Sequence, residues 1–292
     1  QCRIAGVVAV YTATSISLVF TNKVLLESIH APLFVTACQC LVTVLLCVGL
    51  AAVRSDIPGV EYDWRTAMRV MPLSLVFVGM IALNNVCLQY VPVSFYNVAR
   101  SFTIVFNTIN SFVLLGESTS RFTLCTLGIV VLGFVIGVDG EVSLPLLGTL
   151  FGVCSSMFVS LNSVFTKSTL SAVGGNKFRL MLYNNLNACV LFVPLLGVTG
   201  EAAYLWSPAG WATVASPLPL FKVCCSALLS FVMGFITVAQ IELTSPLTHS
   251  IVGTAKACLQ TGLAFAVWRN PTTVQHLFGN ALVLAGTLLY SV

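Results

Sequence analysis

Charged residues are scarce in this sequence, and their scarcity argues against a soluble globular protein. Only 8% of its 292 residues are charged, whereas 58% are hydrophobic, and the mean hydropathy is +0.99. A water-soluble globule of this length needs far more polar surface than that. The composition therefore predicts a polytopic membrane protein whose main partner is the lipid bilayer.

Acidic residues are scarcer still, and none falls in the middle of an apolar stretch. A proton-coupled exporter of cationic drugs normally needs a carboxylate within the membrane, so this class is disfavoured. A membrane-bound glycosyltransferase would need paired or metal-binding carboxylates at a membrane face. Asp56, Glu61 and Asp63 lie in one short loop and are more simply a solvated connection. We therefore expect a protein that is not an enzyme and has no cofactor.

The sequence also lacks the cysteine spacing of a metal site. Most of its 11 cysteines fall inside apolar stretches, where they behave as small hydrophobic residues. Neither the pair Cys38 and Cys40 nor the pair Cys224 and Cys225 is followed by a second pair at metal-ligand spacing. We expect no bound metal.

Long polar segments are missing as well. The longest connections are residues 54-70 and 199-219, so the chain has no separate soluble domain and function must lie between helices. Apolar stretches of about 17 to 25 residues, each sufficient to cross a bilayer as a helix, follow one another along residues 1-292. We expect an all-α integral membrane protein of one domain with ten spanning helices. The ten are 5-25, 33-53, 71-90, 93-115, 122-138, 146-166, 180-198, 220-241, 247-268 and 275-292.

The lysines and arginines predict the orientation. Ten spans place both termini on one side, and most of the loop cations fall on that side, which favours a cytoplasmic location for the termini. The net charge of +4 is then mainly a consequence of topology. A nucleic-acid partner is not expected.

The two halves of the chain share a pattern. The segment 77-82 is followed by Pro92, and the similar segment 231-236 is followed by Pro246 at the same spacing of fifteen residues. The third and eighth predicted helices therefore correspond, which divides the chain into repeats 1-140 and 141-292. Because five helices are an odd number, the second repeat enters the membrane from the opposite side. Such an inverted repeat is typical of transporters that bind their substrate near the membrane midplane.

Two cations lie deep within predicted spans. Lys256 and Arg100 are costly in a bilayer unless they face a cavity or a partner, and a dianionic ligand would neutralise both. The alternative is that each cation packs against neighbouring helices, which requires a carboxylate partner. The acids nearest to the ends of predicted spans on the cytoplasmic side are Glu117 and Glu242. At helical spacing the cations belong to two polar stripes, which are Tyr96, Arg100, Thr103 and Asn107, and His249, Gly253, Lys256 and Gln260.

Residues 182-187 are unusually polar for a predicted span. Tyr183 and Asn187 share a face, and the amides of Asn184 and Asn185 can donate hydrogen bonds to a heterocycle and accept them from it. The alternative is an amide cluster that joins helices. Asn22, with Tyr11 and Ser15, forms a weaker polar face for which cavity lining and helix packing remain equally open.

Three segments, 94-101, 183-187 and 245-258, resemble nucleotide-sugar transporters of the drug/metabolite transporter superfamily, and most closely the Golgi GDP-fucose transporters. The related GDP-mannose transporters use a Phe-Tyr-Asn-Asn motif for guanine and a Gly-Ala-Leu-Asn-Lys motif for the phosphates. The resemblance implies that Tyr183, Asn184 and Asn185 bind guanine and that Lys256 binds the diphosphate. Leu182 replaces the phenylalanine of the first motif, and Val252 stands at the glycine of the second.

The resemblance also implies import of GDP-fucose into the Golgi in exchange for GMP. The alternatives are transport of GDP-mannose or another nucleotide sugar, and a phosphate antiporter for triose phosphate or phosphoenolpyruvate. The oligomeric state is open, with a homodimer among the arrangements. The predicted substrate-binding residues are Asn22, Tyr96, Asn97, Arg100, Tyr183, Asn184, Asn185, His249, Gly253, Thr254 and Lys256.

Overall fold

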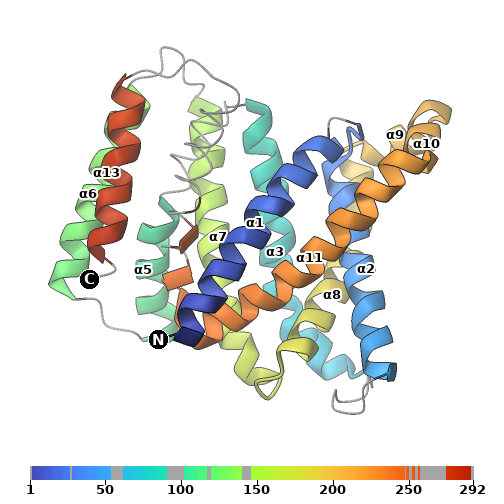
Figure 1. The fold of residues 1–292 in the computed structure, drawn as a ribbon, viewed down its shortest axis with the longest axis horizontal. Coiled ribbons are helices and arrows are strands. Elements are labelled where there is room, and N and C mark those ends of the chain that lie inside the picture. The colour runs from blue at the N-terminus through green and yellow to red at the C-terminus, as the bar shows by residue number, and fades with distance from the viewer. Residues whose placement is uncertain are drawn as a thin grey trace. The chain divides into compact units, whose positions relative to one another are not determined.

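A computed structural model describes most of the chain. The residues that it describes are 2-26, 28-53, 62-90, 102-116, 120-139, 146-246, 248, 249, 252, 253, 256 and 274-290. Throughout these residues the regular structure is helical and contains no β-strand. Figure 1 colours the helices in chain order. They are α1 (Cys2–Leu26), α2 (Pro32–Val53), α3 (Trp64–Tyr90), α5 (Phe102–Leu115), α6 (Arg121–Asp139), α7 (Leu146–Ala172), α8 (Lys177–Val198), α9 (Glu201–Trp206), α10 (Pro208–Ala215), α11 (Pro217–Leu243) and α13 (Val274–Tyr290).

Five of the described helices are long and apolar enough to cross a membrane. At a rise of 1.5 Å per residue, about 20 residues cross a hydrocarbon layer of roughly 30 Å. The multi-pass membrane architecture predicted from composition is therefore supported by the described helices. The five spans are Ile4–Leu26, Pro32–Val53, Trp64–Asn84, Lys177–Val198 and Pro217–Leu243.

The helix boundaries differ most from the sequence prediction in three places, the first of which is the end of α7, six residues beyond the predicted position 166. The connection predicted at residues 199-219 contains two short helices, α9 and α10. Helix α3 begins seven residues before the predicted position 71, because Asp63 caps its first turn by accepting hydrogen bonds from the N–H groups of Arg65 and Thr66. The predicted stretch 247-268 lies mostly outside the described residues.

The chain forms two compact units, and each draws on both halves of the sequence. One unit contains residues 1-78 and 168-243, and the other contains residues 79-167 and 244-292. Helices α3 and α7 each continue from one unit into the other. The units therefore do not coincide with the predicted repeats, because each unit combines segments from both of them.

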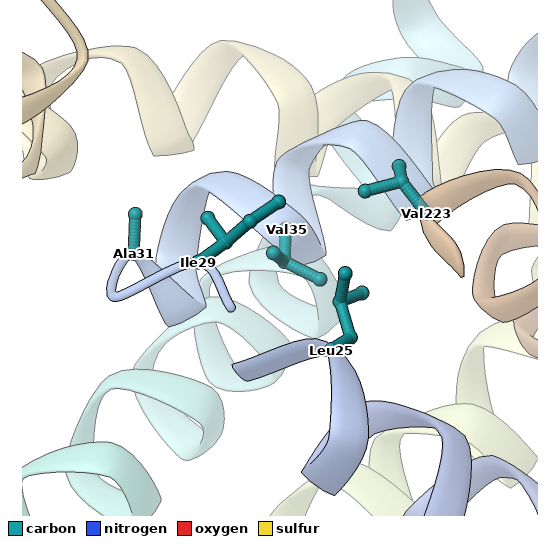
Figure 2. Packing of buried hydrophobic residues seen from close by; sticks show 5 residues of the cluster. All are labelled: Leu25, Ile29, Ala31, Val35 and Val223. Carbon is teal, nitrogen blue, oxygen red and sulfur yellow. The ribbon is translucent and has the colours of Figure 1, made fainter. Parts of the chain in front are cut away.

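The first unit is built around α1, α2, α8 and α11. Helix α11 packs along α1 and α2, and α2 packs along α8. One apolar cluster joins the end of α1, the start of α2 and the start of α11 (Figure 2). Its buried members are Leu25, Ile29, Ala31, Val35 and Val223.

In the second unit, α13 lies alongside α6 (Figure 1). Small residues allow the close approach. A Cβ atom added to Gly133 would lie 2.9 Å from the backbone oxygen of Gly279, and one added to Gly286 would lie 2.9 Å from a methyl carbon of Val130. A similar contact joins the end of α3 to α7, where a Cβ on Gly79 would lie 2.6 Å from the ring of Phe158. These contacts follow the small-residue packing expected between membrane helices.

Candidate functional site

The described residues include seven of the predicted site residues, and these belong to different units. Asn22, Tyr183, Asn184 and Asn185 belong to the first unit, whereas His249, Gly253 and Lys256 belong to the second. The predicted positions Tyr96, Asn97, Arg100 and Thr254 lie outside the described residues.

A tight turn between α7 and α8 sets the start of α8. Gly174 and Gly175 have φ values of 71° and 73°, the left-handed region in which glycine is favoured. The N–H of Gly175 donates to the carbonyl of Leu170 and closes α7. Asn176 then caps α8 by accepting a hydrogen bond from the N–H of Arg179. Residues 177-187 therefore follow a well-defined helix start.

Tyr183 is buried against the start of α3. Its hydroxyl oxygen accepts a hydrogen bond from the backbone N–H of Asp63 at 2.8 Å, and its side chain is 2% exposed. The ring of Tyr62 lies 6.0 Å away between centroids, and the guanidinium carbon of Arg179 lies 5.8 Å from the ring centre. Such a distance permits a cation–π contact. In this conformation Tyr183 therefore ties α8 to α3.

The neighbouring amides bond to both helices. Asn184 Oδ1 accepts a hydrogen bond from Ser74 Oγ at 3.0 Å, and Asn187 Nδ2 donates to the carbonyl of Ala67 at 2.9 Å, so two amides hold α8 against α3. Asn185 Nδ2 donates to the carbonyl of Met181 within α8. These bonds use neither Asn184 Nδ2 nor Asn185 Oδ1, and both side chains are partly exposed. The segment thus serves helix packing, and one donor and one acceptor of its two consecutive amides are not used by these bonds.

The electrostatics at the beginning of α3 favour a charged carboxylate. The pKa of Asp63 is lowered from its usual value, first by the hydrogen bond from the Thr66 hydroxyl and then by that from the Arg65 N–H, with a smaller contribution from the charge of Arg179. At the start of α8, Lys177 pairs with Glu242 at 2.6 Å. Glu242, one of the two acids considered as partners of the buried cations, is therefore engaged by the first residue of α8.

Asn22 lies in a hydrogen-bonded triad that joins three helices. Gln39 Nε2 donates to Asn22 Oδ1 at 3.0 Å and to Ser226 Oγ at 2.5 Å, and Ser226 Oγ donates to Asn22 Oδ1. Gln39 and Ser226 are buried. Of the two alternatives for Asn22, helix packing is the one for which this structure gives specific contacts, and its role in substrate binding remains a prediction.

The second unit contains a buried polar network that the sequence indicated only in part. Asn107, fully buried, accepts a hydrogen bond from Ser160 Oγ at 2.9 Å, and Asn110 donates to the same serine at 2.8 Å. Ser155 Oγ donates to Asn84 Oδ1 at 2.6 Å. The sequence stripe included Asn107 but not Asn84 or Asn110, although an asparagine within an apolar helix is itself a signal of an interhelical contact.

Among the described residues of α5 and α7, three polar atoms are buried without a hydrogen-bond partner. They are Thr103 Oγ1, Ser111 Oγ and Asn162 Oδ1, on helices α5 and α7. A buried polar group that lacks a partner is costly, and such groups often take part in ligand or water binding. Thr103 belongs to the same predicted stripe as Asn107.

Lys256 and His249 lie on a helical stretch whose start is well defined. Ser245 Oγ accepts a hydrogen bond from the N–H of Thr248, and Pro246 occupies the first helical position. Asn107 Nδ2 donates to the carbonyl of Pro246 at 3.3 Å, which ties this start to α5. His249, Gly253 and Lys256 are partly buried and follow the predicted helical spacing. Within the described residues no group of three or more His, Cys, Asp or Glu side chains is arranged to hold a metal.

Comparison with known proteins gives consistent matches over nearly the whole chain. The profile of the Triose-phosphate Transporter family matches residues 2–291. GDP-fucose transporter 1 of Mus musculus is 45% identical over 302 residues, which cover 99% of this chain and 82% of the mouse protein. A Drosophila melanogaster protein named GDP-fucose transporter, Golgi, is 36% identical, over 99% of this chain and 89% of its own length.

One solved crystal structure is similar with a TM-score of 0.66, at 14% sequence identity, over 97% of this chain and 95% of the other. At that level of identity the similarity concerns the fold alone.

Proposed function

The chain belongs to the Triose-phosphate Transporter family, and from this membership we propose that it is an antiporter that imports GDP-fucose into the Golgi lumen in exchange for GMP. The observation that supports GDP-fucose as the substrate is the similarity to named GDP-fucose transporters, which covers 99% of the chain. The apolar helices support a multi-pass membrane location. The termini are cytoplasmic in this proposal, as the lysine and arginine distribution predicts.

We propose ten spanning helices in two inverted repeats, and the helix pairings support this. A two-fold relation between the repeats makes α1 equivalent to α7, α2 to α8, and α3 to α11. The packing of α11 on α1 then requires that α3 contact α7, as Gly79 and Phe158 do. The packing of α11 on α2 requires that α3 contact α8, as Ser74 and Asn184 do. The two-fold relation exchanges α2 with α8 and α6 with α13, and the two helices of each of these pairs pack against each other.

In the proposed site, the amides of Asn184 and Asn185 bind guanine. The Watson–Crick edge of guanine has an acceptor beside two donors, and an adjacent amide donor and acceptor complement it. Asn184 Nδ2 and Asn185 Oδ1 are the atoms that the helix contacts leave for this purpose. Tyr183 acts as a positioning residue, because its hydroxyl and ring hold α8 against α3.

The cations Lys256 and Arg100 bind the phosphates in this proposal, and the other proposed substrate-binding residues of the same two segments are Tyr96, Asn97, His249, Gly253 and Thr254. Without ligand the two positive charges disfavour a closed, desolvated state, and a nucleotide phosphate neutralises them. To open to the other side of the membrane, the site must pass through this closed state. The closed state is then reached only with GDP-fucose or GMP bound. Obligatory exchange by alternating access follows from this coupling.

The test is transport by the purified full chain in liposomes loaded with GMP. We expect uptake of labelled GDP-fucose that depends on internal GMP, is weakened by GDP-mannose, and resists UDP-galactose and phosphoenolpyruvate. Lys256→Ala should abolish uptake. Lys222→Ala is the matched control, because Lys222 donates to Ser28 Oγ and the carbonyl of Val24 outside the proposed site, and it should transport normally.

Two results would overturn parts of this proposal. Efficient uptake into liposomes without internal nucleotide would refute obligatory exchange. Inhibition by phosphoenolpyruvate with no effect of guanine nucleotides would favour the second candidate, a phosphate antiporter for triose phosphate or phosphoenolpyruvate, which the name of the family suggests.

A further inference from the structure

The two short helices α9 and α10 form an arm between the spanning helices α8 and α11, and this arm has a single charged residue. Glu201 opens the arm, and the next charged residue in the sequence is Lys222. The intervening residues include two of the four tryptophans of the chain, Trp206 and Trp211. A connection that lies in water is normally rich in polar and charged residues, so this composition needs an explanation.

The single charge of the arm is used internally. The carboxylate oxygens of Glu201 accept hydrogen bonds from the backbone N–H groups of Leu33 and Phe34 at 3.1 and 2.8 Å. These N–H groups belong to the first turn of α2, where they have no partner within the helix and where the helix dipole favours a negative charge. Glu201 thus fastens the arm to α2 instead of giving it a charged outer surface.

One side of the arm is packed and its bend is tight. Tyr204 and Val214 pack against the apolar cluster of Leu25, Ile29, Ala31, Val35 and Val223 shown in Figure 2. Ser207 caps α10 by accepting a hydrogen bond from the N–H of Gly210, and its hydroxyl donates to the carbonyl of Tyr204 at 2.6 Å. A Cβ atom on Gly210 would lie 2.1 Å from that carbonyl oxygen, so only glycine fits there. The arm is therefore a defined structure.

The opposite side of the arm is apolar and exposed. Trp206 is 88% exposed and Trp211 is 64% exposed. The exposed apolar surface continues onto Val198 at the end of α8 and onto Leu218 and Phe221 at the start of α11. Both of these helices are membrane-spanning candidates. The arm thus extends the exposed apolar surface of two helices that are long and apolar enough to span a membrane.

We propose that the α9–α10 arm lies in the boundary between lipid headgroups and acyl chains, with Trp206 and Trp211 as its anchors. Tryptophan is enriched at this depth, because its ring is apolar while its N–H needs a polar partner. A helix pair whose one charge is bound to α2 and whose outer side is apolar and aromatic suits the interface better than water. By fixing the arm, Glu201 and the tryptophans set the depth of the ends of α8 and α11.

The test is depth-dependent quenching of tryptophan fluorescence in the reconstituted full chain. Variants that keep only Trp206 or only Trp211, with phenylalanine at the other three tryptophan positions, are placed in phosphatidylcholine vesicles. The acyl chains carry bromine near the carbonyl end, in the middle or near the methyl end. We expect the strongest quenching from bromine near the carbonyl end and weak quenching by aqueous acrylamide.

Three other results would overturn the proposal. Strong quenching by acrylamide with none by brominated lipid would place the arm in water. Strongest quenching by bromine near the methyl end would place it deep in the hydrocarbon. Little quenching by either, reversed when the protein is diluted in lipid, would assign the surface to a second copy of the chain. If a triple substitution fails to fold, the wild type is compared with Trp206→Phe/Trp211→Phe. The double variant should lose the fluorescence that bromine near the carbonyl end quenches in the wild type, which measures the same contact of the arm with lipid.

Discussion

The hydroxyl of Tyr183 on α8 accepts a hydrogen bond from the backbone N–H of Asp63, the residue that caps α3. One tyrosine therefore holds the second turn of α8 against the start of α3. Because the two amides next in sequence are the proposed guanine ligands, the bond also fixes the orientation in which they are presented. The relationship separates two roles for Tyr183, contact with substrate and positioning of α8, that the sequence motif alone does not distinguish.

Removing only the hydroxyl tests the positioning role. We expect Tyr183→Phe to lower the free energy of unfolding by about 1 kcal/mol, the usual contribution of one neutral hydrogen bond, and to retain GDP-fucose uptake. Tyr183→Ala should cost about 3–5 kcal/mol, as expected for a buried aromatic ring, and should lose transport. Thermal unfolding in detergent and uptake into liposomes measure these effects. The control is Tyr62→Phe, since Tyr62 is largely exposed.

An unchanged unfolding temperature in Tyr183→Phe, combined with loss of uptake, would contradict the positioning role. It would show instead that the hydroxyl contacts the substrate directly.

Asp63 gives the stability of the protein a specific dependence on acid pH. The pKa of Asp63 in the folded protein lies below the usual value, chiefly because the Thr66 hydroxyl donates to the carboxylate. Asp63 lies just outside the candidate span that begins at Trp64. The stabilisation is therefore present above the unfolded pKa of about 3.9 and is lost as the pH falls through the lower folded pKa. We expect the unfolding temperature of the wild type to fall more steeply below about pH 4 than that of Asp63→Asn, which keeps a capping oxygen but does not titrate. Parallel curves for the two proteins would rule out this contribution of Asp63.

In the part of the chain that the structure describes, apolar length and polar interruptions predicted where the five candidate spans lie, because both are properties of a continuous segment. Predicted stretches such as 33-53 and 180-198 match α2 and α8 closely. The short helices α9 and α10 were missed because they are too brief to show a period. The start of α10 is nonetheless visible in the sequence, since Ser207-Pro208 combines a capping serine with proline at the first helical position.

The polar residues of the site were easier to find than to interpret. Sequence singled out Asn22 and Asn184 because amides are rare in apolar helices. Their partners Ser226 and Ser74 lie 204 and 110 residues away along the chain, and only the fold brings them together. Whether a buried amide packs helices or binds substrate depends on those partners, so the sequence left both alternatives open.

The triad of Asn22, Gln39 and Ser226 should behave as a coupled structural unit. A double-mutant cycle with Asn22→Ala and Ser226→Ala should give a coupling energy of about 0.5–1.5 kcal/mol in unfolding, in the range of hydrogen bonds between membrane helices. The KM for GDP-fucose should change little in either single variant. A severalfold rise in KM for Asn22→Ala at an unchanged unfolding temperature would instead assign Asn22 to the substrate site.

Two glycines on α6 provide the sharpest test of how α6 packs against α13. A Cβ on Gly133 would meet the backbone of Gly279 and Val283 at 2.9 Å, and backbone atoms cannot move aside without separating the helices. We therefore expect Gly133→Ala to destabilise the protein by about 1–3 kcal/mol, the usual cost of overpacking.

Gly128 lies on the same helix with nothing within 4 Å of an added Cβ, so Gly128→Ala is the matched control. It should be neutral or should stabilise the protein by up to about 1 kcal/mol, because alanine favours helix more than glycine does. Unfolding temperatures of the two variants, measured side by side in one detergent, distinguish close packing from helix propensity.

The proposed inverted repeat exchanges α6 with α13, so a glycine on α13 should behave like Gly133. A Cβ on Gly286 would meet Val130 and the carbonyl of Thr126, and we expect Gly286→Ala to resemble Gly133→Ala. Equal effects at Gly128 and Gly133 would mean that helix propensity and not close packing governs these positions.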